Sequence, residues 1–177
     1  MRLIVALVVL ALGVSVISGM PPAVAAPDFD LQAHRGGRGE TTEESLRGFA
    51  KALEVGVSTL EFDVVITGDG QPLVWHDPVI EPTKCTDTAP ALPRHPQYPY
   101  VGKLVHDLTL PQIRTLDCGK LLTNFPSAEV VSGNKIATLP EVFDLTAAYR
   151  ADVRYNIETK VEDGKSGGEG MVALTTA

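Results

Sequence analysis

The sequence predicts an α/β fold, because segments with the repeat of β-strands alternate with segments that have the repeat of helices. Residues 59–67 and 153–160 alternate apolar and polar side chains, as strands with one buried face do. Two other segments, which begin near residues 42 and 138, space their apolar residues as one face of a helix does. A short apolar run at residues 31–33 ends in a glycine-rich loop and is expected to form a further strand.

The first helix is expected to run from Thr42 to Gly56. Glu43 and Glu44 are expected in its first turn, where negative charges are favourable, and the glycine is a typical end signal. The apolar face of this helix consists of Leu46, Phe49, Ala50 and Leu53.

The strand at residues 59–67 separates two kinds of side chain. Its apolar face is expected to hold Leu60, Phe62, Val64 and Ile66. The opposite face then carries Glu61, Asp63 and Val65. Carboxylates that alternate along a strand often face only solvent, which is the alternative interpretation of these two.

A β-hairpin is expected to follow this strand. The Asp-Gly dipeptide at residues 69–70 is typical of a two-residue hairpin turn, so residue 68 should pair with residue 71. This register places His76 directly opposite Asp63, on the same face of the sheet. A shift by one residue would send the imidazole to the other side.

An irregular segment is expected to follow the hairpin. Residues 78–107 are rich in proline and are expected to form a long irregular insertion. Thr109 is expected to cap a short helix that runs to Leu116. Thr138 is expected to cap a second helix. The residues that this helix turns inward are Val142, Phe143 and Leu145.

Residues 1–25 are typical of a cleaved secretory signal, with an apolar run followed by small residues at the cleavage site. An uncleaved membrane anchor is the alternative, but the apolar run from residue 3 to residue 16 is short for a bilayer span. We therefore expect a secreted or otherwise extracytoplasmic protein with no stable membrane span after the signal is removed.

Two cysteines, Cys85 and Cys118, predict one disulfide in an exported chain, because the compartment outside the membrane is oxidising. Two buried free thiols are the alternative. A zinc site is disfavoured, since neither cysteine belongs to a CxxC pair and the chain has no HExxH motif.

The charge of the chain excludes one class of partner. The formal net charge is −7 at pH 7, and no run of lysine or arginine is present to neutralise the phosphates of a nucleic acid. A small anionic substrate would have to be held locally, by a metal ion and one or two cationic side chains.

The titratable residues of the first half are of the kinds that cleave phosphate esters. His34 and Arg35 follow the first strand. Glu61 and Asp63 lie on the second strand, and His76 follows the turn after it. Two carboxylates, two imidazoles and a guanidinium are suited to bind a divalent cation and to hydrolyse a phosphate ester beside it.

Four short motifs follow one another in this order: Ala-His-Arg-Gly-Gly at 33–37, Glu-Phe-Asp-Val at 61–64, Asp-Gly leading into Val-Trp-His-Asp-Pro at 69–78, and Asn-Ile-Glu-Thr-Lys at 156–160. Together they resemble the glycerophosphodiester phosphodiesterase family. The resemblance implies a TIM-type (β/α) barrel of the phosphatidylinositol-phospholipase-C-like superfamily. It also implies the hydrolysis of small glycerophosphodiesters to glycerol 3-phosphate and an alcohol.

The same resemblance implies a metal site. Glu61, Asp63 and Glu158 match the ligands that the family uses for a Ca²⁺ or Mg²⁺ ion. Ligands that offer only oxygen suit such a hard cation, which agrees with the chemistry inferred from the residues themselves.

Other matched positions have roles in catalysis and in substrate binding. His34 and His76 match the acid and base pair of the family, and Arg35 matches its phosphate contact. Lys160 is expected near the phosphate, with a solvated lysine at a strand end as the alternative. Glu43 keeps the carboxylate of a family motif whose asparagine is lost here, and it is either a site residue or a helix-start residue.

Only part of a barrel is visible in the sequence. A closed barrel typically takes about 250 residues and eight strands, whereas we expect four strands within residues 26–163 and a flexible tail at residues 164–177. The chain therefore resembles the N-terminal half of such an enzyme. An open sheet would leave an exposed edge, through which the chain could self-associate.

Three functions stay open at this point. The first is a metal-dependent glycerophosphodiester phosphodiesterase. The second is a catalytically inactive fragment that binds a divalent cation or a glycerophosphoryl group. The third is a phospholipase that cleaves phospholipid head groups, but such an enzyme needs an apolar lip for docking on membranes, and the proline-rich insertion offers little contiguous apolar surface.

Overall fold

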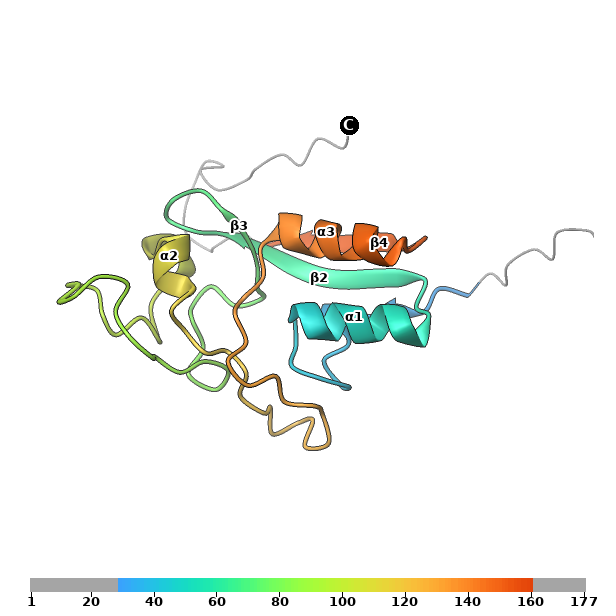
Figure 1. The fold of residues 1–177 in the computed structure, drawn as a ribbon, viewed down its shortest axis with the longest axis horizontal. Coiled ribbons are helices and arrows are strands. Elements are labelled where there is room, and N and C mark those ends of the chain that lie inside the picture. The colour runs from blue at the N-terminus through green and yellow to red at the C-terminus, as the bar shows by residue number, and fades with distance from the viewer. Residues whose placement is uncertain (1–28, 161–177) are drawn as a thin grey trace, which may run out of the picture.

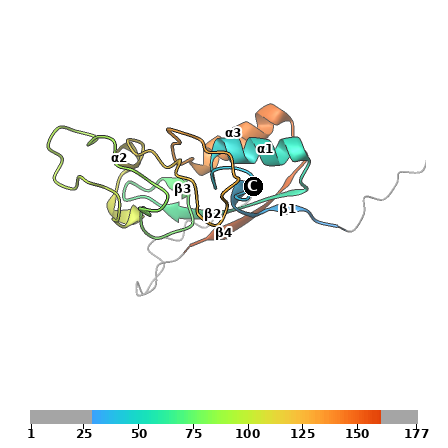
Figure 2. The same cartoon turned by 90° about the horizontal axis from the view of Figure 1, so that it is seen from below.

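A computed structural model of the protein describes residues 29–160. Two helices lie side by side on one face of a small β-sheet, and an irregular part extends beyond one end of the sheet (Figure 1, Figure 2). The strands are β1 (Gln32–Ala33), β2 (Thr59–Ile66), β3 (Pro72–Val74) and β4 (Arg154–Thr159). The helices are α1 (Leu46–Val55), α2 (Leu110–Ile113) and α3 (Leu139–Tyr149), with single 3₁₀ turns η1 (His34–Gly36) and η2 (Val105–Asp107).

The central strand of the sheet is β2. It pairs in parallel with β1 at its beginning and with β4 along most of its length. It pairs in antiparallel with β3 at its end. A parallel pair needs a crossover connection, and α1 and α3 belong to the two crossovers of this sheet. The predicted α/β fold with four strands is confirmed.

Self-association through an open sheet edge stays a prediction. Among residues 29–160, the strand partner of β4 is β2, so the other edge of β4 has no strand beside it.

The helix α1 begins later than predicted, because Ser45 rather than Thr42 caps it. The Ser45 hydroxyl accepts a hydrogen bond from the N–H of Gly48 at 2.9 Å, which satisfies one of the free donors of the first turn. Glu43 and Glu44 therefore precede the helix, and both are buried there. The prediction that they lie in the first helical turn is wrong.

The turn between β2 and β3 contains three residues rather than two. The backbone N–H of Thr67 donates to the carbonyl of Gln71 at 3.0 Å, which leaves residues 68–70 as the loop. Of the Asp-Gly pair only Gly70 has a positive φ, 78°, whereas the two-residue turn expected for Asp-Gly needs positive φ at both positions. The Thr67 hydroxyl closes the loop by accepting from Gln71 and donating to Asp69.

The predicted hairpin register is consequently wrong by one residue. Trp75, not His76, lies opposite Asp63, and its N–H donates to the Asp63 carbonyl at 3.0 Å. Since β3 ends at Val74, strand alternation does not set the direction of the His76 side chain.

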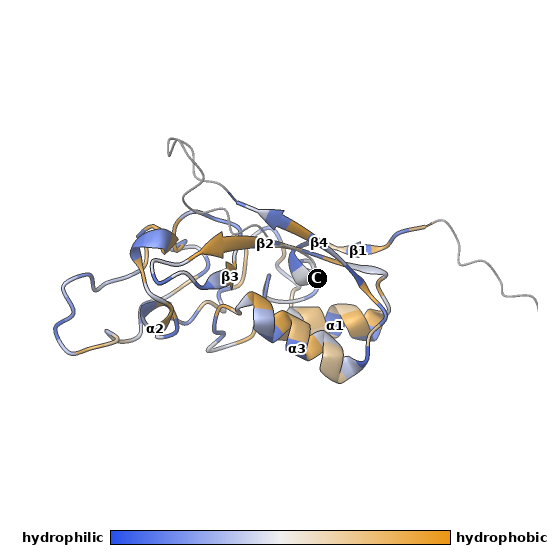
Figure 3. Cartoon of the chain, turned by 90° about the horizontal axis from the view of Figure 1, so that it is seen from above, coloured by the Kyte–Doolittle hydropathy of each residue, from blue (hydrophilic) through white to orange (hydrophobic). Residues whose placement is uncertain are grey.

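The predicted alternation along β2 is confirmed, and it contributes side chains to two separate cores. Leu60, Phe62 and Val64 pack with Phe49 of α1 and with Val142 of α3. Figure 3 shows both helices together on this side of the sheet. On the opposite face Val65 joins a second core that lies under the insertion. The two carboxylates of β2 share that second face.

One residue of α3 does not point inward as predicted. The Phe143 side chain is 38% exposed, and its ring packs edge-on against Tyr155 of β4 at a centroid distance of 5.1 Å. The buried residues of the helix are Leu139, Val142 and Thr146, which are spaced as one face of a helix. Leu145 packs against the core from a partly buried position.

The predicted insertion at residues 78–107 is irregular and packed. Apart from η2 it forms no helix or strand, yet the side chains of Ile80, Tyr100 and Val105 are almost fully buried. Such burial stabilises one conformation in a segment that has few of the regular backbone hydrogen bonds of helices and strands.

Both predicted caps of the later helices are present. Thr109 forms a capping box with Gln112, and Thr138 forms one with Glu141. The helix α2 ends at Ile113 and not at Leu116, because the following residues form tighter turns. The N–H of Leu116, for example, donates to the carbonyl of Ile113 at 3.1 Å.

Cys85 and Cys118 form the predicted disulfide, which closes 33 residues of chain. Replacing both with alanine should lower the free energy of unfolding by about 3 kcal/mol, chiefly because the unfolded chain gains freedom. Alanine is preferred to serine, since both sulfurs belong to buried residues and a hydroxyl there would lose its water. Urea denaturation measures the change. The wild type with reductant should match the variant, and a variant as stable as the oxidised wild type would contradict the expectation.

The predicted signal at residues 1–25 and the predicted tail at residues 164–177 lie outside the described residues, and the extracytoplasmic location stays a prediction. None of the helices within residues 29–160 combines the length and the apolar character that crossing a bilayer requires.

Candidate active site

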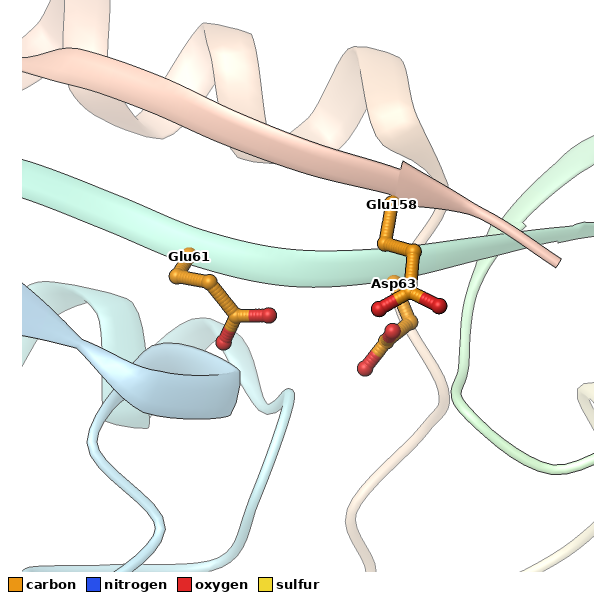
Figure 4. A group of neighbouring side chains, drawn as sticks. All are labelled: Glu61, Asp63 and Glu158. Carbon is orange, nitrogen blue, oxygen red and sulfur yellow. The ribbon is translucent and has the colours of Figure 1, made fainter.

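Three carboxylates from two strands meet on the face of β2 that is turned away from α1 and α3. Glu61 and Asp63 alternate along β2, and Glu158 of β4 is the register partner of Asp63. One oxygen from each of the three lies within 4.8 Å of the other two (Figure 4). The parallel pairing of β2 with β4 thus brings together residues that are far apart in sequence.

Asp63 has the environment of a cation ligand. Its side chain is 2% exposed, and neither carboxylate oxygen has a hydrogen-bond partner among the described residues. Lys160 Nζ lies 3.0 Å from one oxygen and Arg35 Nε lies 3.6 Å from the other. These two ion pairs balance only part of the charge of the three neighbouring carboxylates, and a hard cation would satisfy the oxygens that remain. The three carboxylates therefore fit a hard divalent cation.

The 3₁₀ turn η1 presents His34 and Arg35 at the end of β1. Arg35 has a φ of 48°, and its N–H donates to Glu61 Oε2 at 2.7 Å. Gly36 also has a positive φ, and a Cβ there would lie 2.9 Å from the ring of Phe49. Strained backbone of this kind persists where the surroundings fix it, and it is frequent in active sites. The turn leaves His34 exposed, with Nε2 4.0 Å from Glu61.

Glu43 is a buried anion among three cations. Its carboxylate lies 3.5 Å from Arg35 Nη1 and 2.8 Å from Arg38 Nη2, and it also pairs with Lys84. Its position before α1 rules out the helix-start role and places it beside the predicted phosphate contact.

Glu44 binds the backbone of β2. Its carboxylate accepts the backbone N–H of Asp63 at 3.1 Å. Burial, and then the neighbouring charge of Asp63, raises the pKa of Glu44 well above its usual value.

Among the described residues, no hydrogen bond or ion pair joins His76 to the three carboxylates. Within the described part of the chain its partner is Asp77, whose Oδ1 lies 3.0 Å from His76 Nδ1. Asp77 in turn pairs with Lys84, which also binds Glu43. The imidazole is thus connected to the rest of the site through successive contacts of Asp77, Lys84 and Glu43. The predicted pairing opposite Asp63 does not make this connection.

Lys160 is part of the acidic cluster rather than a solvated lysine. Its Nζ donates to Glu158 at 2.5 Å and lies close to Asp63. Burial alone would lower the pKa of Lys160, but these carboxylates raise it above its usual value. The ammonium balances part of the negative charge on this face.

Sequence reasoning missed Lys84, Asp77 and Glu44 as parts of the site. Lys84 lies in a segment with no periodic pattern, so nothing in the sequence marks it except its place beside Cys85. Asp77 follows a histidine, and an adjacent carboxylate is the one signal that could have assigned it a role.

The comparisons with known proteins agree with this arrangement. Residues 34–173 match the Glycerophosphoryl diester phosphodiesterase family. A glycerophosphodiester phosphodiesterase of Caldanaerobacter subterraneus subsp. tengcongensis is 32% identical over 128 residues, which are 72% of this chain and 44% of the relative. A glycerophosphodiester phosphodiesterase of Bacillus subtilis is 30% identical over 176 residues, 94% of this chain and 54% of the relative. The chain spans about half the length of these curated relatives.

Solved structures give the same picture. A candidate glycerophosphoryl diester phosphodiesterase from Silicibacter pomeroyi superposes with a TM-score of 0.65 at 32% identity, over 77% of this chain and 47% of that chain. An Oleispira antarctica phosphodiesterase in complex with its product sn-glycerol 3-phosphate superposes with a TM-score of 0.56 at 25% identity, over 74% of this chain and 44% of that chain. These neighbours are TIM-barrel enzymes, so the expected barrel type is confirmed, with β1, β2 and β4 as parallel strands of it.

Proposed function

The chain belongs to the glycerophosphoryl diester phosphodiesterase family, and on that basis we propose that it hydrolyses glycerophosphodiesters to glycerol 3-phosphate and an alcohol with a bound divalent cation. The convergence of Glu61, Asp63 and Glu158 beside Arg35 carries the proposal. It joins a cluster that fits a hard cation to a guanidinium that fits a phosphate.

Glu61, Asp63 and Glu158 would hold the cation, Ca²⁺ or Mg²⁺. When bound, such an ion neutralises phosphate oxygens and stabilises the charge that develops on them. The buried carboxylate of Asp63 supports this role, because Lys160 and Arg35 balance only part of the negative charge that the three carboxylates bring together.

Side chains of the chain itself would bind the phosphate and move the protons. Arg35 is held by Glu61 through its backbone and by Glu43 through its side chain, so its guanidinium is fixed for a phosphate oxygen. One of His34 and His76 takes a proton from the attacking hydroxyl or water. The other gives a proton to the departing alkoxide, so the two start in opposite protonation states.

The substrate class follows from the relatives. The Oleispira antarctica phosphodiesterase holds sn-glycerol 3-phosphate, the product that we propose for this chain. The described residues hold three parallel strands, whereas a closed barrel has eight. The inactive fragment that binds a cation or a glycerophosphoryl group is therefore the second candidate.

Incubation of the purified chain with glycerophosphocholine tests the proposal. We expect release of glycerol 3-phosphate that requires Ca²⁺ or Mg²⁺, stops when the cation is chelated, and returns when it is restored. A coupled glycerol 3-phosphate assay and metal analysis measure both events.

Each other outcome has a defined meaning. Cation binding without turnover under either metal would favour the inactive fragment. Faster cleavage of lysophospholipid or diacyl phospholipid than of glycerophosphocholine would favour the phospholipase and overturn the substrate class proposed here.

A further inference from the structure

The irregular insertion supplies a buried lysine to the site. The Lys84 side chain is 11% exposed. Its Nζ pairs with Glu43 Oε1 and with Asp77 Oδ2, and it lies 4.8 Å from the ring centroid of Trp75. An ammonium with so little water depends on its anionic partners, so its position is fixed by both carboxylates.

Asp77 connects this lysine to His76. One oxygen of Asp77 faces Lys84, and the other lies 3.0 Å from His76 Nδ1. Burial raises the pKa of Asp77, but its hydrogen bonds to Lys84 and His76 outweigh that effect, and the pKa lies below its usual value. The carboxylate is therefore an acceptor, which favours a proton on Nδ1 and leaves Nε2 free.

The segment that carries Lys84 is itself held in place. The next residue, Cys85, is linked to Cys118 by the disulfide. The Lys84 carbonyl accepts the N–H of Lys120 at 3.2 Å, and the N–H of Thr86 donates to Asp117 at 2.7 Å. Lys84 is thus fixed at its backbone as well as at its ammonium.

We propose that Lys84 is a positioning residue for His76, which acts by holding the Asp77 carboxylate so that it accepts the Nδ1 proton and leaves Nε2 for proton transfer. The inference rests on the proposed function, because that function gives His76 a role in proton transfer. The same ammonium binds Glu43, which holds Arg35, so Lys84 links the proton-transfer side of the site to the phosphate side.

The tautomer of His76 tests this inference without any turnover. Long-range ¹H–¹⁵N spectra, recorded where the ring is neutral, should show the proton of wild-type His76 on Nδ1. Lys84→Met removes the charge but keeps the side-chain length, and it should move the proton partly to Nε2. Lys84→Arg should keep the wild-type tautomer. Lys135→Met removes an exposed lysine that binds only backbone carbonyls away from the Lys84 segment, and it should change nothing.

The kinetic readout separates positioning from a purely structural role. Lys84→Met should lower kcat by about 10- to 100-fold, the usual range for partners that orient a functional side chain, while KM and cation affinity stay within about twofold. A proton on Nε2 in the wild type, or an unchanged tautomer in Lys84→Met, would overturn the inference. If Lys84→Met fails to fold, the position of the His76 proton in Lys84→Gln and in the wild type tests the inference instead. If the chain shows the expected tautomers but no turnover, the proposed function is overturned and the positioning of His76 by Lys84 is not.

Discussion

Replacing Asp63 with asparagine is expected to lower kcat/KM by about 1,000-fold, which corresponds to ~4 kcal/mol of lost transition-state stabilisation. Asparagine keeps the size of the side chain but removes the charge that would hold the cation between Glu61 and Glu158. Initial rates with glycerophosphocholine at saturating Ca²⁺ or Mg²⁺ measure the loss.

The same variant should remain folded, and in the absence of a cation it should melt within about 5 °C of the wild type. Losing the Asp63 charge removes its ion pairs with Lys160 and Arg35, but it also removes one cause of the raised pKa of Glu44. These two effects oppose each other, so the net change in stability is small.

Thermal melting with and without the cation tests this part of the prediction. A ligand that binds only the folded state raises its stability, so the wild type should gain thermal stability with the cation and Asp63→Asn should not. Asp144→Asn, at an exposed position of α3, is the matched control and should behave as the wild type. Full cation-dependent turnover in Asp63→Asn would show that the ion is not held at this place.

Strand alternation and the family resemblance together predicted the acidic cluster. Alternation places Glu61 and Asp63 on one face by period two, and the resemblance identifies Glu158 on a second strand as the third ligand. Their convergence needs only that β2 and β4 be neighbours in register, which the structure shows.

The hairpin register could not be predicted, because it depends on a side chain. The Thr67 hydroxyl and the Asp69 carboxylate close a loop one residue longer than the Asp-Gly signal alone predicts. Lys84 could not be predicted either, since its segment has no period and its position depends on tertiary contacts with Glu43 and Asp77.

Replacing either His34 or His76 with asparagine is the other change with a large expected effect. Each variant should lower kcat by about 10²- to 10⁴-fold, the usual contribution of a positioned general acid or base. The His34 side chain is 62% exposed, so its replacement should leave the packing unchanged. His95→Asn is the control. That ring contacts Gln112 in the region of the insertion, and its loss should leave kcat near the wild-type value.

The pH dependence of kcat then assigns the two roles. The base must be deprotonated and accounts for the limb that rises with pH, whereas the acid must be protonated and accounts for the limb that falls. Each single variant should therefore lose one limb. The double variant should be scarcely slower than the slower single variant, because both groups act in one reaction. A histidine whose replacement keeps both limbs and more than about a tenth of kcat transfers no proton in this reaction.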